Sequence, residues 1–291
     1  AGKNVLVLEA GFNPWPGLGE RDEPPLPQHS NDEVKYESRA WDDPGALLQP
    51  RTFRTSPGVA AGINDDVNVM PQMIGGGWSH ADMKSPRFNV VDFQLATTFA
   101  QTVAANPGLV IPGWNDGPGG TPTANFADWP FTYAELAPFY DEAECLYGVQ
   151  GDATDNPFAS SRFGRGYPMP PGLGMYFNLL LADAARRTSF LGEPLHPHTY
   201  PTCVNSRFRD HRPPCVDCGP CSGSGCPNNA KGSPAVTALL GALRTNRCQV
   251  RVHCRATRLV NDGGNVSAVV YYDGDGVRQI VEADAFVLAA G

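Results

Sequence analysis

The sequence predicts an α/β protein in which part of the sheet is parallel. Residues 4–8 form a short, continuous apolar run that ends in an acid and a glycine. This pattern is typical of a strand buried on both faces of a parallel sheet. A second apolar run at residues 285–290 predicts another strand, and helical and strand-turn-strand patterns alternate between the two runs. Alternation of this kind is expected of an α/β chain with an α+β part.

Length, composition and charge limit the classes of protein to which this chain can belong. A length of 291 residues allows one large core or two domains. No stretch approaches the roughly 20 apolar residues that cross a bilayer. The net charge of -8 and the lack of a basic stripe argue against nucleic acid as a partner. The 32 glycines and 28 prolines indicate long, ordered loops between the elements.

A predicted strand lies at each end of the chain. Ala1 lies three residues before the first apolar run, and Gly291 follows the last run at once. Intact domains rarely begin or end in this way, so we expect both ends to be cut. Any targeting segment would then lie outside these residues.

Glu9 ends the first apolar run and is followed by Ala10 and Gly11. In a dinucleotide-binding fold, the acid at the end of the second strand hydrogen-bonds the adenosine ribose. The glycine fingerprint precedes that acid by about 20 residues, so here it would fall before Ala1. Glu9 is therefore a candidate ribose ligand, and the alternative is a solvated strand end.

A glycine triplet, Gly75, Gly76 and Gly77, precedes Trp78. Three glycines remove every side chain from a stretch of backbone, so a planar or anionic group can approach it closely. Exposed N–H groups there could cradle a pyrophosphate or face a flavin ring. The alternative is a flexible turn.

Local signals place several other elements. Thr132 and Glu135 have the spacing of a capping box at the start of a helix. Residues 175–187 read as a second helix. Ser233 is the expected N-cap of a third helix, with Pro234 at its first position and its end near residue 245. Two strands at 249–260 and one at 266–273 are separated by turns at 262–265 and 273–276.

Four of the eight cysteines are clustered with the spacing C-x2-C-x2-C-x4-C-P. They are Cys215, Cys218, Cys221 and Cys226. The spacing is one residue from the run that holds iron–sulfur clusters in bacterial ferredoxins. Four soft ligands also suit zinc, although zinc sites normally draw ligands from two separated loops. The pattern thus leaves three readings: an iron–sulfur cluster, zinc, or disulfides and free thiols.

The order of these motifs resembles the glucose–methanol–choline (GMC) oxidoreductase family, in particular its bacterial gluconate, sorbitol and glucose dehydrogenases. The motifs are the strand that ends in Glu9 and Gly11, the glycine triplet before Trp78-Ser79-His80, Asp128-Trp129-Pro130, Tyr167-Pro168-Met169-Pro170-Pro171, the cysteine cluster with Ala230-Lys231-Gly232-Ser233, and the closing Val287-Leu288-Ala289-Ala290-Gly291. The resemblance covers nearly all 291 residues and is weakest between about 12 and 60.

The resemblance implies a discontinuous, Rossmann-like FAD-binding domain at 1–95 and 203–291, with a substrate-binding segment at 96–202 inserted in it. Glu9 would bind the adenosine ribose, and Gly75, Gly76 and Gly77 would follow the pyrophosphate and flavin. Ala256 would face the adenine through its backbone, and Ala289, Ala290 and Gly291 would close beside the pyrophosphate. In some sugar oxidases of the family, a histidine at the place of His80 is joined covalently to the flavin. Trp78 and Ala81 depart from the usual residues nearby, which puts local flavin contacts in doubt.

The family reaction is hydride transfer from an alcohol or sugar carbon to the flavin N5. The histidine base of the family, with its His or Asn partner, would lie beyond Gly291, so we expect no catalytic residue in this segment and no activity from it alone. Some relatives carry a three-iron cluster on cysteines in the region of 215–226. With such a cluster, electrons would leave through it to a cytochrome or quinone, and a small subunit is a further expected partner. The sequence does not decide between a bacterial periplasm and a cytoplasm.

Overall fold

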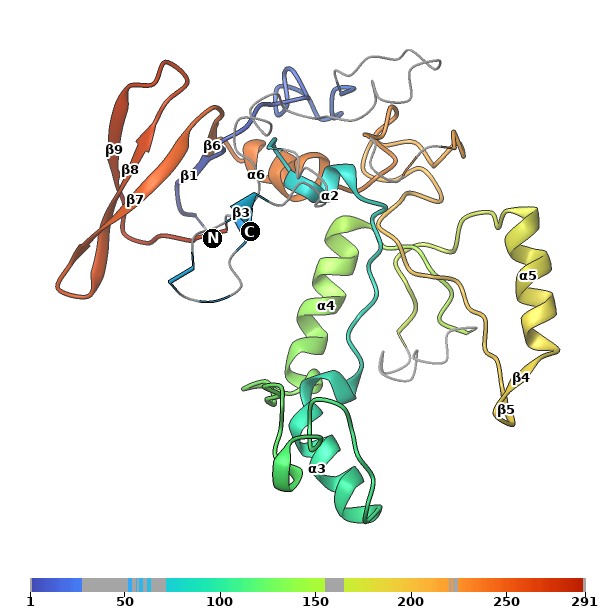
Figure 1. The fold of residues 1–291 in the computed structure, drawn as a ribbon. Helices are drawn as coiled ribbons and strands as arrows, with labels where there is room; N and C mark the ends of the chain where they lie inside the picture. Colours follow the sequence, from blue (N-terminus) through green and yellow to red (C-terminus); the bar gives the residue numbers. More distant parts are fainter. Residues whose placement is uncertain are drawn as a thin grey trace. The chain divides into compact units, whose positions relative to one another are not determined.

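The computed structural model describes residues 2–27, 72–154, 165–219, 221 and 225–289, together with the short stretches 52–53, 56, 58–59 and 62–63. The chain divides into two compact units (Figure 1). The first unit contains Ala1–Met83 and Arg207–Gly291, and the second is Lys84–Ser206. A first unit built from both ends of the chain, with strands and helices in each unit, confirms the predicted α/β class. The boundaries expected after residues 95 and 202 stay a prediction.

The first unit contains the predicted parallel pairing. Strand β1 (Val5–Leu8) pairs in parallel with β6 (Cys248–Arg251), in a register that sets Val5 opposite Cys248 and Leu8 opposite Arg251. Burial is weaker than the continuous apolar run predicts, because Val5 is 50% exposed. Within the described residues the pair has no third strand on either edge, so apolar surface of the run remains open.

A three-stranded antiparallel sheet follows β6 in the same unit. It consists of β7 (Arg255–Asp262), β8 (Asn265–Tyr272) and β9 (Arg278–Glu282). Both predicted turns are confirmed. Gly263 and Gly264 take the positive φ values that the first turn requires, and the Asp273 carboxylate accepts the backbone N–H groups of the second. A shorter pair, β2 (Thr52–Phe53) and β3 (Gly62–Ile63), is also antiparallel.

The core of this unit joins residues that are far apart in sequence. Trp15, Met73, Ile74, Ala235 and Val236 are all buried in one cluster. Met73 and Ile74 precede helix α2 (Gly76–His80), and Ala235 and Val236 begin a helical segment. That segment is a π-helical stretch, η5 (Ala235–Leu239), followed directly by α6 (Leu240–Leu243).

Two local expectations in this unit are wrong. The helix after Ser233 exists, but Pro234 is its N-cap and the Ser233 hydroxyl caps nothing, because the first turn is the wide π type that Leu239 N–H closes on Pro234 O at 2.9 Å. The predicted strand at 285–290 is not formed in the described residues 285–289. Val287 is 91% exposed, since no described strand pairs with this run or covers it.

The second unit is mainly helical. Its elements are η2 (Val90–Phe93), α3 (Leu95–Ala105), η3 (Pro118–Gly120), α4 (Tyr133–Tyr147), α5 (Tyr176–Arg186) and the hairpin β4 (Ser189–Phe190) with β5 (Glu193–Pro194). The capping box at α4 is confirmed. Glu135 N–H donates to Thr132 Oγ1 at 3.3 Å, and Thr132 N–H donates to Glu135 Oε2 at 2.7 Å. Gly148, in the left-handed conformation, ends this helix.

A buried arginine holds α4 to the segment before η2. Arg87 donates to both oxygens of Glu144, at 2.7 and 2.8 Å, and to Asp141 at 2.6 Å. Next to it, Phe93 packs among aromatic rings that include Trp129 and Tyr133. Of the helices that the structure describes, none combines the length and apolar character needed to span a membrane.

Candidate functional site

Three segments of the first unit meet at the carboxyl end of the parallel strand pair. The pairing of β1 with β6 continues past both strands, since Glu9 N–H donates to Arg251 O at 2.9 Å. Cys254 N–H then donates to Glu9 O at 2.8 Å, and His253 N–H donates to Gly11 O at 2.8 Å. Ligands of open α/β sheets bind at this end of the strands.

The third segment lies on the other side of residues 11 and 12. Phe12 N–H donates to Gln72 O at 3.3 Å, and Ile74 N–H donates to Phe12 O at 3.0 Å. The backbones are so close that a Cβ on Gly11 would lie 1.7 Å from Gln72 O. Only glycine fits between the two neighbouring segments, so Gly11 allows this junction to form.

The Glu9 side chain is fixed within the junction. Its Oε1 accepts the Gly11 N–H at 2.8 Å, and the side chain is partly buried. Burial raises the pKa of the carboxyl group, and the hydrogen bonds from Gly11 and Ala10 oppose that effect. A carboxylate held in this way retains lone pairs that can accept hydrogen bonds from hydroxyl groups of a ligand.

The glycine triplet begins directly after the segment that pairs with Phe12. Gly75 has a φ of 85°, and a Cβ there would lie 2.3 Å from Ser79 Oγ and 3.4 Å from the Ala235 side chain. Gly76 differs, because a Cβ on it would meet no atom within 4 Å. The triplet thus packs against the core through Gly75 and is open at Gly76. Gly77 lies within α2.

The structure brings some of the predicted site residues together. Ala256 follows Cys254, whose N–H binds Glu9, by two residues. The pairing of β7 with β8 shifts its register after Ala256, which interrupts the regular backbone hydrogen bonding between the two strands there. His80 ends α2, but its side chain lies outside the described residues. Ala289 is exposed and not in a strand, and Ala290 and Gly291 lie outside the described residues.

These residues fit the adenosine and pyrophosphate part of FAD. A partly buried carboxylate stands at the end of the parallel pair, and the backbone at Gly76 is open to a bulky group. Glu9 and the triplet stay predicted site residues, and the sequence analysis missed the close packing of Gly11 against Gln72. A glycine two residues after the acid was the available signal, since close backbone approach needs that residue type.

The cysteine loop, residues 215–226, is anchored at both of its ends. Cys226 Sγ donates to Asn228 Oδ1 at 3.1 Å, and the Asn228 amide donates to Pro214 O at 3.2 Å. Lys231 lies next to the loop, only 4% exposed, and its Nζ donates to Cys221 O at 2.7 Å. Sequence reasoning missed this lysine, because a single Lys beside a cysteine motif gives no sign of its burial.

The four thiols influence one another electrostatically. Burial raises the pKa of the Cys221 thiol, while the charge of Lys231 opposes that effect and Cys218 and Cys226 add to it. Burial also raises the pKa of the Cys215 thiol. All four cysteines are free thiols in the structure. In the described part of the chain, no three His, Cys, Asp or Glu side chains converge to hold a metal ion. The donor chemistry therefore suits a soft metal, but the arrangement of the thiols does not.

Comparison with known proteins gives a consistent result. Residues 200–291 match the family model of the GMC oxidoreductases. The chain is 29% identical over 182 residues to the gluconate 2-dehydrogenase flavoprotein of Pantoea cypripedii, across 56% of this chain and 29% of that protein. It is 27% identical over 298 residues to 2-methyl-1,2-propanediol dehydrogenase of Mycolicibacterium austroafricanum, across 100% of this chain and 45% of that protein.

A third relative is the fructose dehydrogenase large subunit of Gluconobacter japonicus, 26% identical over 166 residues, across 56% of this chain and 29% of that protein. The chain spans less than half the length of each of these relatives. The GMC oxidoreductase model is thus matched by residues 200–291, and one relative aligns with the whole chain. The chain is similar to GMC oxidoreductases in this C-terminal part and, at lower identity, along its whole length.

Proposed function

We propose that this chain is the nucleotide-binding part of an FAD-dependent oxidoreductase that oxidises a CH–OH group of a sugar, a polyol or another alcohol. The observation that carries the proposal is the junction of residues 9–12, 72–74 and 251–254, in which the Glu9 carboxylate accepts the Gly11 N–H and the segment paired with Phe12 leads directly into the glycine triplet. The names of the three relatives support the substrate class, because gluconate, 2-methyl-1,2-propanediol and fructose all carry hydroxyl groups.

When bound, FAD would accept a hydride from the alcohol carbon. The residues of this chain bind and orient the cofactor. The Glu9 carboxylate accepts hydrogen bonds from the ribose hydroxyls, and the open backbone at Gly76 admits the pyrophosphate and flavin. The backbone of Ala256, at the register shift of β7, would contact the adenine when FAD is bound.

The fate of the electrons is a finer proposal. We place an iron–sulfur cluster on Cys215, Cys218, Cys221 and Cys226, where the thiols would have to converge further than they do in the structure. A cytochrome or quinone would then be the acceptor, and a small subunit a partner. The phrase "large subunit" in the name of the fructose dehydrogenase relative supports a partner subunit.

Two rival functions make different predictions. An oxidase of the same family would use oxygen directly and pair its cysteines in disulfides. A non-catalytic metal or electron-carrier module built on the cysteine loop would bind metal and no flavin.

The test combines a cofactor titration with one absorption spectrum. Fluorescence quenching of added FAD measures binding to the 291-residue chain, and Glu23→Gln, at an exposed position of the same unit, is a matched control for changes at Glu9. Visible absorption and analyses of iron and sulfide then report the cluster. Saturable FAD binding by the chain, with iron in the full-length protein, supports the dehydrogenase. Flavin with peroxide formation and no iron in the full-length protein supports the oxidase. Metal without any FAD binding would refute the proposal.

A further inference from the structure

Arg251 is a charged side chain beside the candidate site that has no part in the proposed function. It is exposed and ends β6, at the carboxyl end of the parallel pair. Its carbonyl oxygen accepts the Glu9 N–H at 2.9 Å, so its backbone lies directly beside the acid that is expected to bind the ribose. Because ligands of open α/β sheets bind at this end of the strands, the Arg251 side chain is placed to meet one.

The Arg251 guanidinium is held by neutral groups from two strands. Its Nη1 donates to the Tyr271 hydroxyl on β8 at 2.7 Å, and its Nη2 donates to Gln249 Oε1 on β6 at 3.4 Å. Among the residues that the structure describes, Arg251 forms no ion pair with a carboxylate. The guanidinium is therefore fixed in direction while its charge is not neutralised.

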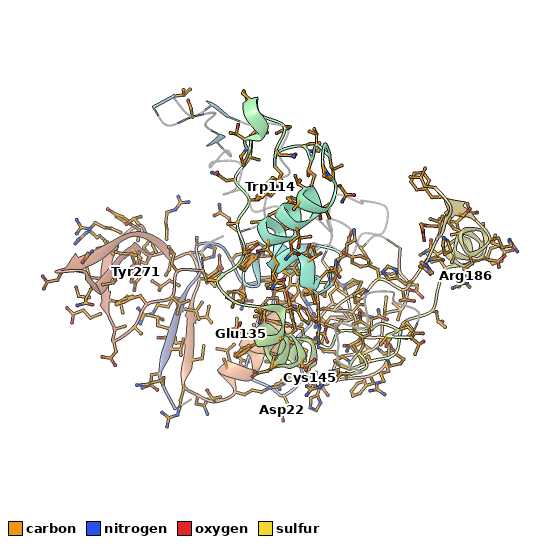
Figure 2. The ribbon with its side chains drawn as sticks, turned by 90° about the horizontal axis from the view of Figure 1, so that it is seen from below. Asp22, Trp114, Glu135, Cys145, Arg186 and Tyr271 are labelled. Carbon is orange, nitrogen blue, oxygen red and sulfur yellow. The ribbon has the colours of Figure 1, made fainter. Side chains whose placement is uncertain are left out.

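Tyr271 relates this guanidinium to the position that is expected to contact adenine. Tyr271, labelled on the sheet in Figure 2, is 4% exposed and lies directly opposite Ala256 in the pairing of β7 with β8. Residues directly opposite each other in an antiparallel pair direct their side chains to the same face of the sheet. Burial raises the pKa of the Cys254 thiol and the charge of Arg251 opposes that effect, so the guanidinium also lies near the segment that leads into β7.

The chemistry of the Arg251 side chain indicates what it fits. A guanidinium is planar and weakly hydrated, and it stacks on the face of an aromatic ring. Hydrogen bonds to Tyr271 and Gln249 use N–H groups at the edge of the plane and leave its faces open. A group that is already oriented loses less conformational entropy when a ligand binds. An uncharged aromatic ring next to a ribose, which is the adenosine part of a dinucleotide, matches these properties.

We propose that Arg251 binds the adenine ring of FAD by stacking on it, and that Tyr271 is a positioning residue that orients the Arg251 guanidinium. The inference rests on the proposed function, because FAD supplies the adenine. It adds a side-chain contact to the backbone contact expected at Ala256. It does not depend on the substrate or on the cysteine loop.

Calorimetric titrations with FAD and with ADP test the inference, because both ligands carry adenosine diphosphate and only FAD carries the flavin. Arg251→Met should weaken the binding of both ligands by a similar factor of about 3- to 30-fold. Arg251→Lys keeps the charge but not the plane, so it should weaken binding nearly as much. Arg247→Met is the matched control. This exposed arginine directly precedes β6, at the opposite end of the strand, and donates to Gly2 O at 3.1 Å, so both affinities should stay unchanged.

Tyr271→Phe tests the positioning role, because it keeps the buried ring and removes only the hydroxyl that holds Arg251. Affinity for FAD and for ADP should fall by about 3-fold, and unchanged affinity would refute this role. Circular dichroism shows whether each variant is folded. Should Arg251→Met fail to fold, Arg251→Lys and Tyr271→Phe carry the same test.

The outcomes separate this inference from the proposed function. A wild-type chain that binds neither FAD nor ADP would refute the proposed function itself. If the wild type binds both and Arg251→Met lowers only the melting temperature, Arg251 merely joins the two sheets and the inference is wrong. Wild-type affinity in Arg251→Lys would show that the charge matters and the plane does not, which would overturn stacking on the adenine.

Discussion

Replacing Glu9 by glutamine separates cofactor binding from stability, because the two should change in opposite directions. The carboxylate accepts Gly11 N–H at 2.8 Å, and glutamine keeps the shape of the side chain and one carbonyl oxygen for that bond. What is lost is the charge offered to the ribose hydroxyls. Hydrogen bonds to charged groups contribute about 1.5–3 kcal/mol each, so FAD affinity should fall by roughly 10- to 100-fold.

Without FAD, the Glu9→Gln variant should be more stable than the wild type at pH values where the wild-type carboxylate is ionised. Burial raises the pKa of Glu9, so between its unfolded and folded pKa values the native state binds more protons than the unfolded state. The free energy of unfolding of the wild type therefore decreases as the pH rises through that window. Glu9→Gln removes this decrease, and the difference between the two proteins grows with pH until the folded pKa is passed.

FAD fluorescence titrations and urea unfolding from pH 4 to pH 8 measure both effects. Glu23→Gln serves as the control in each experiment. If Glu9→Gln left FAD affinity unchanged while the control behaved like the wild type, Glu9 would be an ordinary strand end and the proposed nucleotide site would be wrong. If the variant were destabilised at all pH values, the account of the burial of Glu9 would be wrong.

The remaining predictions concern packing and turns. Arg87→Met removes the cation that binds both oxygens of Glu144 and one oxygen of Asp141, which also pairs with Arg165. The free energy of unfolding should fall by about 3–5 kcal/mol in urea melts, with little loss expected if the pair is solvated. Thr132→Ala removes the α4 cap and should cost about 1 kcal/mol. Gly11→Ala should prevent folding of the first unit, as seen by circular dichroism, because its Cβ would overlap Gln72 O. Gly76→Ala meets no atom and should cost only about 1 kcal/mol for its positive φ, yet weaken FAD binding.

Elements with local causes were predictable from the sequence. The capping box of α4 depends on two side chains three residues apart, and both turns of the β7–β9 sheet depend on glycine or aspartate within four residues. The helix over residues 175–187 was placed within one residue of α5 (Tyr176–Arg186). In each case the physical cause lies inside the segment itself.

Elements with distant causes were not predictable in the same way. The π-helical turn at Ala235–Leu239 packs against Trp15 and Met73, so its shape depends on residues more than 150 positions away. The apolar run at 285–290 has the pattern of a strand, but a strand forms only where another strand supplies its hydrogen bonds. The burial of Lys231 and the clamp on Gly11 likewise arise from contacts between separate segments.

The cysteine loop shows the limit of spacing as evidence. A short spacing keeps four thiols near one another. The structure agrees, since Cys218 and Cys226 both contribute to the raised pKa of the Cys221 thiol. Spacing does not make the thiols converge. The loop is anchored at Pro214 and Asn228, and Lys231 holds the Cys221 carbonyl, which leaves the side chains of Cys218 and the partly buried Cys221 as the thiols that would move toward a metal.

The difference between the anchored ends of the loop and its two central thiols predicts the result of a cobalt titration of the reduced chain. If the loop closes on a metal, Co²⁺ should produce a thiolate charge-transfer absorption, and Cys218→Ser with Cys221→Ser should abolish it, because two thiolates cannot replace four. Cys145→Ser, at an exposed cysteine on α4, should leave the absorption unchanged. An absorption that survives the double substitution would place the metal elsewhere. No absorption at all would mean that the thiols stay apart, as they are in the structure, and would count against the proposed cluster on the cysteine loop.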